Sequence, residues 1–179
     1  METSNISFPC GISSIIFRIT QLNDSRPHIV ALCAQALTNL CLNSILRNEV
    51  LSSRSLQKML STAEKFQHDW TVVLNVSSML VNISRPGPEE SSSRLSLLEG
   101  VGSIVIFIRR AATIYESNNA ITYRLYLVLR NLAYNRIWRE QLLSGGVREL
   151  LSMAEKREYS DEVANTIRST KLILDSDHL

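Results

Sequence analysis

The stretch that decides the fold is "NLAYNRIWREQLLSGGVRELL", residues 131–151. Its Asn, Trp, charged residues and Gly pair could be mistaken for the edge of a catalytic site. Gly145 and Gly146 instead indicate a turn between two helices, because glycine permits the left-handed backbone that ends a helix. A phosphate-binding glycine loop needs a preceding strand and a Lys-Ser/Thr pair, and neither is present. The stretch therefore predicts two short helices joined by a sharp reversal.

An apolar pattern recurs four times along the chain at intervals of about 45 residues. Each copy has one apolar residue followed by two more at the third and fourth positions after it, which is the buried stripe of a helix. The four trios are Ile12/Ile15/Ile16, Leu56/Met59/Leu60, Val101/Ile104/Val105 and Val147/Leu150/Leu151. The pattern predicts four equivalent helices.

An Asn flanked by apolar residues recurs between these trios, at Asn39, Asn82 and Asn131. The second interval is longer than the first, and the source of the extra length is the Pro/Gly/Ser-rich run "SRPGPEESSS" (84–93), which reads as an inserted surface loop. One unit is therefore a short helix, a turn, a middle helix, a loop and a long helix that bears the Asn.

Composition narrows the class of protein. Of 179 residues, 45% are hydrophobic and 20% charged, with only six Gly and four Pro, which favours helices over a sheet sandwich. The net charge of +2 gives no bulk attraction to nucleic acid or a membrane surface. The apolar run 101–108 is too short to span a bilayer. Three Cys without a pairing motif favour a reducing compartment, and we interpret Cys33 and Cys41 as small core residues.

The chain resembles the armadillo repeat family, with the related HEAT repeats as the alternative. The resemblance rests on "AQALTNLCLN" followed by "LRNEVLSSRSLQKML", and on "LYLVLRNLAYN" followed by "RIWREQLLSGGVRELL". The family pattern is a long helix ending in Asn-Leu, a short helix, Gly and an apolar middle helix. It covers the chain from about residue 11 to residue 174.

This resemblance implies an all-α fold, a right-handed α-solenoid of about four three-helix repeats in which the first and last are atypical. We expect a single domain over 1–179, with units at about 8–43, 44–84, 91–135 and 136–176. The first unit has no convincing short helix, so we expect the chain to be part of a larger protein. The last long helix should begin after an N-cap at Ser160 or Asp161.

The concave face of such a solenoid is its expected binding groove. Residues at the Asn position, and four and seven before it, should line that groove in each long helix. The candidate residues are Gln35, Asn39, Asn75, Ser78, Asn82, Arg124, Asn131, Asn165 and Arg168. In unit four, Leu172 takes the place of the Asn.

The Asn residues allow two interpretations. The resemblance implies that Asn39, Asn82 and Asn131 hold the backbone of an extended peptide, since an amide both donates and accepts hydrogen bonds. Alternatively, each Asn caps or bridges neighbouring helices. Importin-type grooves carry a Trp four residues before the Asn, where this chain has Gln35, Ser78 and Leu127, so a basic nuclear-import signal is not the expected ligand.

Two further residue groups have mainly structural interpretations. Trp70 and Trp138 sit at helix starts and are expected to be core anchors. The Arg residues at 124, 130, 136, 139 and 148 are expected on a solvated helix surface. If Arg124 and Arg168 face the groove, they favour an acidic peptide.

We therefore expect a non-catalytic protein–protein interaction module that binds a peptide or helical segment in the concave groove. The alternative is a structural, self-associating segment of a cytoskeletal or centrosomal-type assembly, joined through the solenoid ends. No catalytic residues, metal ligands or cofactors are expected, because no nucleophile–base pair, metal spacing or phosphate loop is visible. We expect neither nucleic-acid binding nor a membrane span. The expected location is the cytoplasm, with cytoskeletal association left open.

Overall fold

The structure is a computed structural model that describes residues 11–52, 55–86 and 98–176. These residues form ten α-helices and no strand, which confirms the all-helical class. Four of the helices are the expected long ones: α2 (Pro27–Leu40), α5 (Trp70–Ser84), α8 (Asn119–Ala133) and α11 (Asp161–Asp175). The other six are α1 (Ile12–Leu22), α3 (Ser44–Ser52), α4 (Ser55–Lys65), α7 (Leu98–Ile114), α9 (Arg136–Ser144) and α10 (Val147–Ala154).

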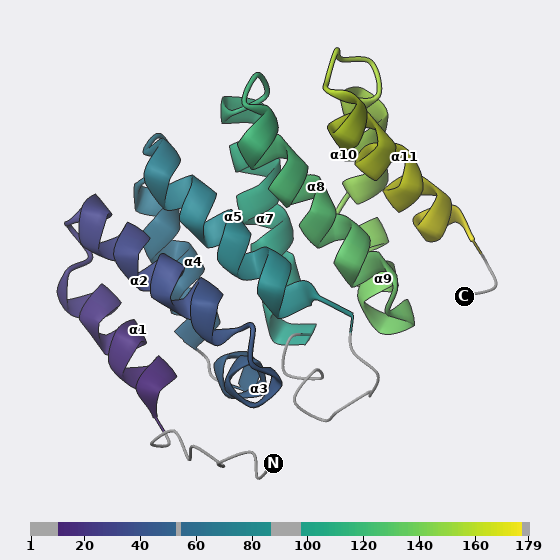
Figure 1. The fold of residues 1–179 in the computed structure, drawn as a ribbon. Helices are drawn as coiled ribbons and strands as arrows, with labels where there is room; N and C mark the ends of the chain where they lie inside the picture. The colour runs from purple at the N-terminus through teal and green to yellow at the C-terminus, as the bar shows by residue number, and fades with distance from the viewer. Residues whose placement is uncertain (1–10, 53–54, 87–97, 177–179) are drawn as a thin grey trace, which may run out of the picture.

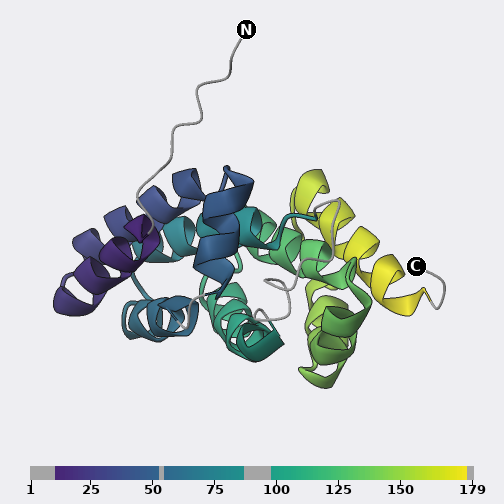
Figure 2. The same cartoon turned by 90° about the horizontal axis from the view of Figure 1, so that it is seen from below.

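The long helices lie side by side in chain order and form one layer (Figure 1). Helix α5 packs between α2 and α8, and α8 packs in turn against α11. Behind them, α1, α4, α7 and α9 follow one another in a second layer, with α10 packed on α9 and α11 (Figures 1 and 2). The predicted loop 84–93 lies outside the described residues from position 87 onward.

Side-chain caps explain where several helices begin. Asp69 accepts hydrogen bonds from two backbone N–H groups in the first turn of α5, at 2.9 and 3.2 Å, and Asn118 accepts one at 3.2 Å at the start of α8. Asn43 and Asn135 cap the short helices α3 and α9 in the same way. Such caps satisfy N–H groups that a helix leaves unpaired at its start.

The core lies between the two layers. Three of the four predicted apolar trios point into it: the one on α4 and the one on α7 are fully buried, and the one on α10 is buried except for the half-buried Leu150. The trio on α1 behaves differently, because Ile15 is 62% exposed. Ile16 packs against the core, but the fully buried residues of α1 are Ser13, Phe17 and Thr20, so the stripe expected there is wrong at Ile15.

The Gly pair forms the predicted turn. Gly146 has a φ of 73°, in the left-handed region, and directly precedes α10. A Cβ at Gly146 would lie 3.1 Å from Arg109 Nη1, and that same nitrogen donates to the Gly145 carbonyl at 3.1 Å. Both the backbone conformation and this close approach of α7 favour glycine.

The two Trp residues have different environments. Trp138 is buried in the core, as expected, and both Cys33 and Cys41 are buried with free thiols. Trp70 is 57% exposed, so its interpretation as a core anchor is wrong. It is the first residue of α5, next to the Asp69 cap. At that position the helix starts at the edge of the layer rather than inside it.

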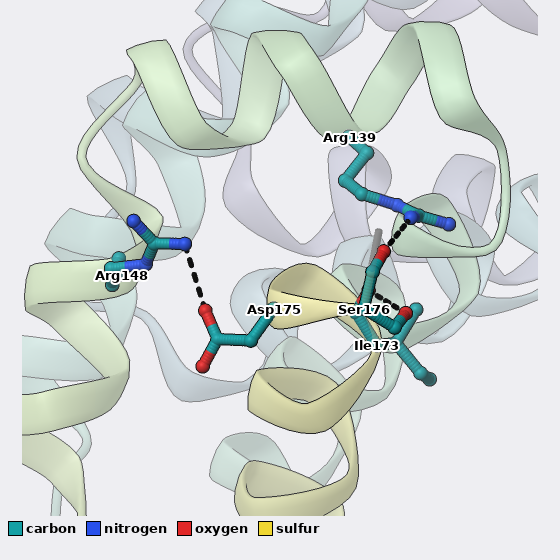
Figure 3. A network of polar contacts seen from close by, with 5 residues as sticks. All are labelled: Arg139, Arg148, Ile173, Asp175 and Ser176. Atoms are coloured by element: carbon teal, nitrogen blue, oxygen red, sulfur yellow. Dashed lines mark hydrogen bonds and ion pairs between the residues drawn. The ribbon is translucent and has the colours of Figure 1, made fainter. Parts of the chain in front are cut away.

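The C-terminal end of the layer is held by Arg139, which is only 7% exposed and not on a solvated surface as expected. Its Nε donates to Ala133 O at 3.0 Å and its Nη1 to Ser176 O at 2.7 Å (Figure 3). Those carbonyls lie at the C-terminal ends of α8 and α11, where a helix carries partial negative charge. Arg148 adds an ion pair to Asp175 at 2.8 Å.

No helix in the described ranges is long and apolar enough to cross a membrane.

The packing between layers can be tested with a matched pair of leucines. Leu37 is fully buried in α2, whereas Leu42, just after that helix, is 64% exposed. Leu37→Ala should lower the free energy of unfolding by about 2–5 kcal/mol, because it leaves a cavity. Leu42→Ala should change it by less than about 0.5 kcal/mol. Urea unfolding followed by far-UV circular dichroism measures both, and equal losses would contradict this core.

Candidate interaction surface on the long helices

The N-caps give the long helices a common register. The caps of α2, α5, α8 and α11 are Arg26, Asp69, Asn118 and Ser160. The sixth residues after the caps are Leu32, Asn75, Arg124 and Thr166. The ninth residues are Gln35, Ser78, Leu127 and Ser169, and the thirteenth are Asn39, Asn82, Asn131 and Ile173.

Two of the three Asn residues bind the preceding long helix. Asn82 Nδ2 donates to Thr38 O of α2 at 2.8 Å. Asn131 Nδ2 lies 3.4 Å from Val81 O of α5 and 3.3 Å from Ser84 Oγ, and its side chain is buried. In each case the accepting carbonyl belongs to the residue just before the Asn of the earlier helix. This is the bridging arrangement that the sequence left open beside peptide binding.

Asn39 occupies the same register position in α2 and is exposed. Helix α2 is the first of the row, so in the described structure no long helix precedes it (Figure 1). The environment of an Asn in this row therefore depends on whether a helix lies before it. The three Asn residues do not form one continuous exposed ladder.

Polar contacts at the middle of the row involve three of the candidate residues. Arg124 Nε donates to Ser78 Oγ at 2.9 Å, joining α8 to α5. Arg124 Nη1 also donates to Ala120 O of its own helix at 2.5 Å. The backbone carbonyl of Asn75 lies 3.5 Å from Thr38 Oγ1. Asn75, Ser78 and Arg124 are all partly exposed, so they lie at the surface along the helix contacts.

The fourth helix is shifted by one residue from the expected register. Asn165 and Arg168 are the fifth and eighth residues after Ser160, so Thr166 and Ser169 take the sixth and ninth places. Leu172 is 73% exposed, while the buried Ile173 stands at the Asn position. Arg168 Nη1 donates to Asn165 Oδ1 at 3.0 Å, and both side chains are exposed.

The residues at the ninth positions after the N-caps of the four long helices form a partly exposed strip across the row. Gln35 is exposed there, and Ser78, Leu127 and Ser169 are half-buried. It is a mixed polar and apolar strip, with the guanidinium of Arg124 beside Ser78 as the positive charge near its middle. Such a strip can hydrogen-bond a backbone and contact apolar side chains, but it holds no paired acid and base.

A hollow of about 970 Å³ lies on the other layer, between α4, α7 and α10. Apolar side chains from α7 and α10 line it, including Ile114, Leu150 and the exposed Met153. Charged residues such as Arg110, paired with Glu64 at 3.0 Å, border it. None of the nine candidate residues lines this hollow, so it is a competing binding site that the repeat pattern did not indicate.

Two buried ionisable side chains have pKa values shifted by their surroundings. Burial raises the pKa of the Cys41 thiol to about 12, and the charge of Arg47 acts in the opposite direction but less strongly. Burial likewise raises the pKa of Tyr126 above its ordinary value, helped by the neighbouring Tyr159. In the described ranges, no three Cys, His, Asp or Glu residues gather in a group that could hold a metal ion.

Comparisons with known proteins give no relative: no family model, curated protein or solved structure matches the chain.

The Asn contacts predict a graded series of stabilities. Asn82→Ala and Asn131→Ala should each lower the free energy of unfolding by about 1 kcal/mol, the net value of one hydrogen bond. Asn39→Ala should leave it within about 0.5 kcal/mol, since that side chain is exposed. Urea unfolding of the three variants measures the series. An equal loss in all three would contradict the bridging role.

Burial of Cys41 predicts an inert thiol. At pH 8 almost none of a thiol with a pKa of about 12 is ionised, and only the thiolate reacts. Cys33 is buried as well, so in a Cys10→Ser chain Ellman's reagent should release no signal from the native protein, and two equivalents after urea unfolding. A Ser61→Cys variant, exposed on α4, is the positive control. Rapid native labelling of Cys41 would show that α2 opens readily.

Proposed function

We propose that the chain is an armadillo-like solenoid that acts as a non-catalytic protein-binding module. Its ligand would be an extended peptide laid across α2, α5, α8 and α11 on the side away from the second layer. The observation that carries this proposal is the common register of the long helices. It repeats polar groups at equivalent positions of neighbouring helices: Gln35, Ser78 and Ser169 at the ninth position after the cap, and Asn75 and Arg124 at the sixth.

The bridging Asn residues change the details of this proposal. Asn82 and Asn131 use an amide N–H to bind the preceding helix, so they set the spacing of the row rather than contact the ligand. The ligand contacts fall instead to Gln35, Asn75, Ser78 and Arg124. A side chain already aligned by a helix–helix hydrogen bond loses less freedom on binding, which favours Arg124 as the anchor.

Charge at the middle of the row favours an acidic ligand. A guanidinium binds a carboxylate through paired, charge-assisted hydrogen bonds. Arg124 approaches Ser78 through Nε and Ala120 through Nη1, so a carboxylate would dock beside a fixed group. Arg168 lies one helix further along and is exposed, but it is turned away from the shared register. We therefore assign the acidic preference to Arg124 rather than to Arg168.

Selection from a phage-displayed library of random peptides tests the proposal. The wild-type chain should enrich acidic sequences, and the best of them, labelled with fluorescein, gives a dissociation constant by anisotropy. Arg124→Glu should weaken that peptide at least tenfold, about 1.4 kcal/mol, because repulsion replaces an ion pair. Gln35→Ala should weaken it less, because it removes a neutral contact.

Two control variants locate the binding site. Lys58→Glu makes the same charge reversal as Arg124→Glu, at an exposed position of α4 on the other layer. It should leave the affinity for the peptide unchanged. Met153→Glu places a charge in the hollow between α4, α7 and α10 and should also have no effect. Loss of binding in Met153→Glu with retention in Arg124→Glu would move the site to that hollow and refute the groove.

A further inference from the structure

Helix α1 carries an apolar seam on its outer face. The seam consists of Ile12, Ile15, Ile19 and Leu22, with successive spacings of three, four and three residues. Ile15 is 62% exposed, Ile19 41% and Leu22 74%, and Ile12 is partly exposed. Alternation of three and four is the a/d spacing by which two helices pack along a coiled-coil seam. Over its 11 residues, which hold two a/d pairs, α1 therefore presents a helix-pairing surface that the rest of the described structure leaves open.

The seam is distinct from the face that holds α1 in the molecule. Ser13, Phe17 and Thr20 are the buried residues of α1, and they point to the opposite side of the helix. Through its inner side α1 packs against α2, α3 and α4, and Ser13 Oγ donates to Glu49 Oε1 of α3 at 2.6 Å. Packing among the described residues therefore does not account for the four apolar residues of the seam.

The seam is complementary to itself. The spacing of three, four and three residues is the same from either end of the helix, and the midpoint of the seam lies level with Phe17. Two α1 helices packed antiparallel would therefore place Ile12 of each against Leu22 of the other, and Ile15 against Ile19. This is the condition for a two-fold contact, in which the same patch of both copies meets. A second copy of the chain needs no surface other than the one already present.

The opposite end of the molecule does not offer a match. Helix α11 lies at the far end of the row from α1 (Figure 1), and it exposes Asp161, Glu162, Asn165 and Arg168, with Leu172 as its one exposed large apolar residue. Two ion pairs also lie there, Arg148–Asp175 at 2.8 Å and Lys171–Glu155 at 2.5 Å. Polar outer faces are typical of the capped end of a helical stack. Covering these charges with isoleucines would cost desolvation energy, so head-to-tail growth is disfavoured.

From these observations we infer that α1 is a self-association surface, through which two copies of the chain pair antiparallel in a closed dimer. Four side chains per copy make a small contact, so the association is weak and reversible. Arg18 is exposed beside the seam and comes near its own symmetry mate, which limits the affinity further. The inference does not depend on peptide binding by the long helices.

Sedimentation equilibrium tests the dimer over chain concentrations from about 1 µM to about 500 µM, where small interfaces associate. The wild-type mass should rise from that of one chain towards twice that value. Leu22→Asp, which adds a charge to the seam in each copy, should raise the dimer dissociation constant at least tenfold. A wild-type chain that stays monomeric over this concentration range would overturn the inference. The seam would then be a binding surface for a helix of another protein.

A leucine at the other end provides the matched control. Leu172 in α11 is 73% exposed, nearly the same as Leu22, so Leu172→Asp makes the same chemical change at the opposite end. It should leave the dissociation constant within twofold of wild type. A larger effect of Leu172→Asp than of Leu22→Asp would place the contact at the C-terminal end and overturn the assignment to α1. Circular dichroism confirms that both variants are folded.

Disulfide trapping tests the antiparallel arrangement, in a Cys10→Ser background. An equal mixture of Ile15→Cys and Ile19→Cys chains should form the mixed disulfide faster than either chain alone forms its own. The reason is that Ile15 meets Ile19 across the two-fold axis. Fast self-linking of Ile19→Cys alone would overturn this arrangement, because it requires two parallel helices.

Discussion

The bond from an Asn amide to a backbone carbonyl of the preceding long helix is the contact on which the row depends. Apolar side chains hold two helices together, but they permit sliding along the helix axis, because burial is not directional. A hydrogen bond at one defined height removes that freedom. Asn82 makes this bond to α2, and Asn131 makes it, with longer distances, to α5. Helices α5 and α8 are thereby each set level with the long helix before them.

The same short motif then starts the next part of the chain. In "NLCLN" and "NLAYN", the first Asn stands at the row position and the second, Asn43 or Asn135, caps the short helix that follows. One side chain type performs two tasks because an amide can donate with its nitrogen and accept with its oxygen. After α5 the motif is broken, since Pro86 takes the place of the second Asn.

Periodicity was sufficient to predict the class of fold and most of the buried stripes. A three-and-four spacing of apolar residues allows little except a helix, and a Gly pair between two such stripes allows little except a turn. It did not distinguish the two faces of α1, because both carry residues at helical spacing and only the neighbouring helices decide which is covered. The spacing therefore places Ile15 in the core, although Phe17 occupies it.

The candidate site was harder to predict, because its residues depend on what stands next to them. The sequence identifies the Asn positions, yet only the carbonyl of Thr38 or Val81 shows that two of them bind inward. In the fourth long helix the Asn is missing. The sequence pattern places Leu172 at the Asn position, which is one residue before the true position at Ile173. Counting from Ser160 restores it. The hollow between α4, α7 and α10 left no signal, because it results from the spacing of three separate helices.

Arg139 has a consequence for the order in which the last helix opens. The final turn of a helix at the end of a stack ordinarily frays first, because its carbonyls are satisfied by water alone. Here Arg139 holds Ser176 O, whereas Ser160 makes no side-chain cap at the other end of α11. Local opening of α11 should therefore begin at its first turn and run towards the C-terminus. Amide hydrogen exchange would show this as protection that increases along the helix.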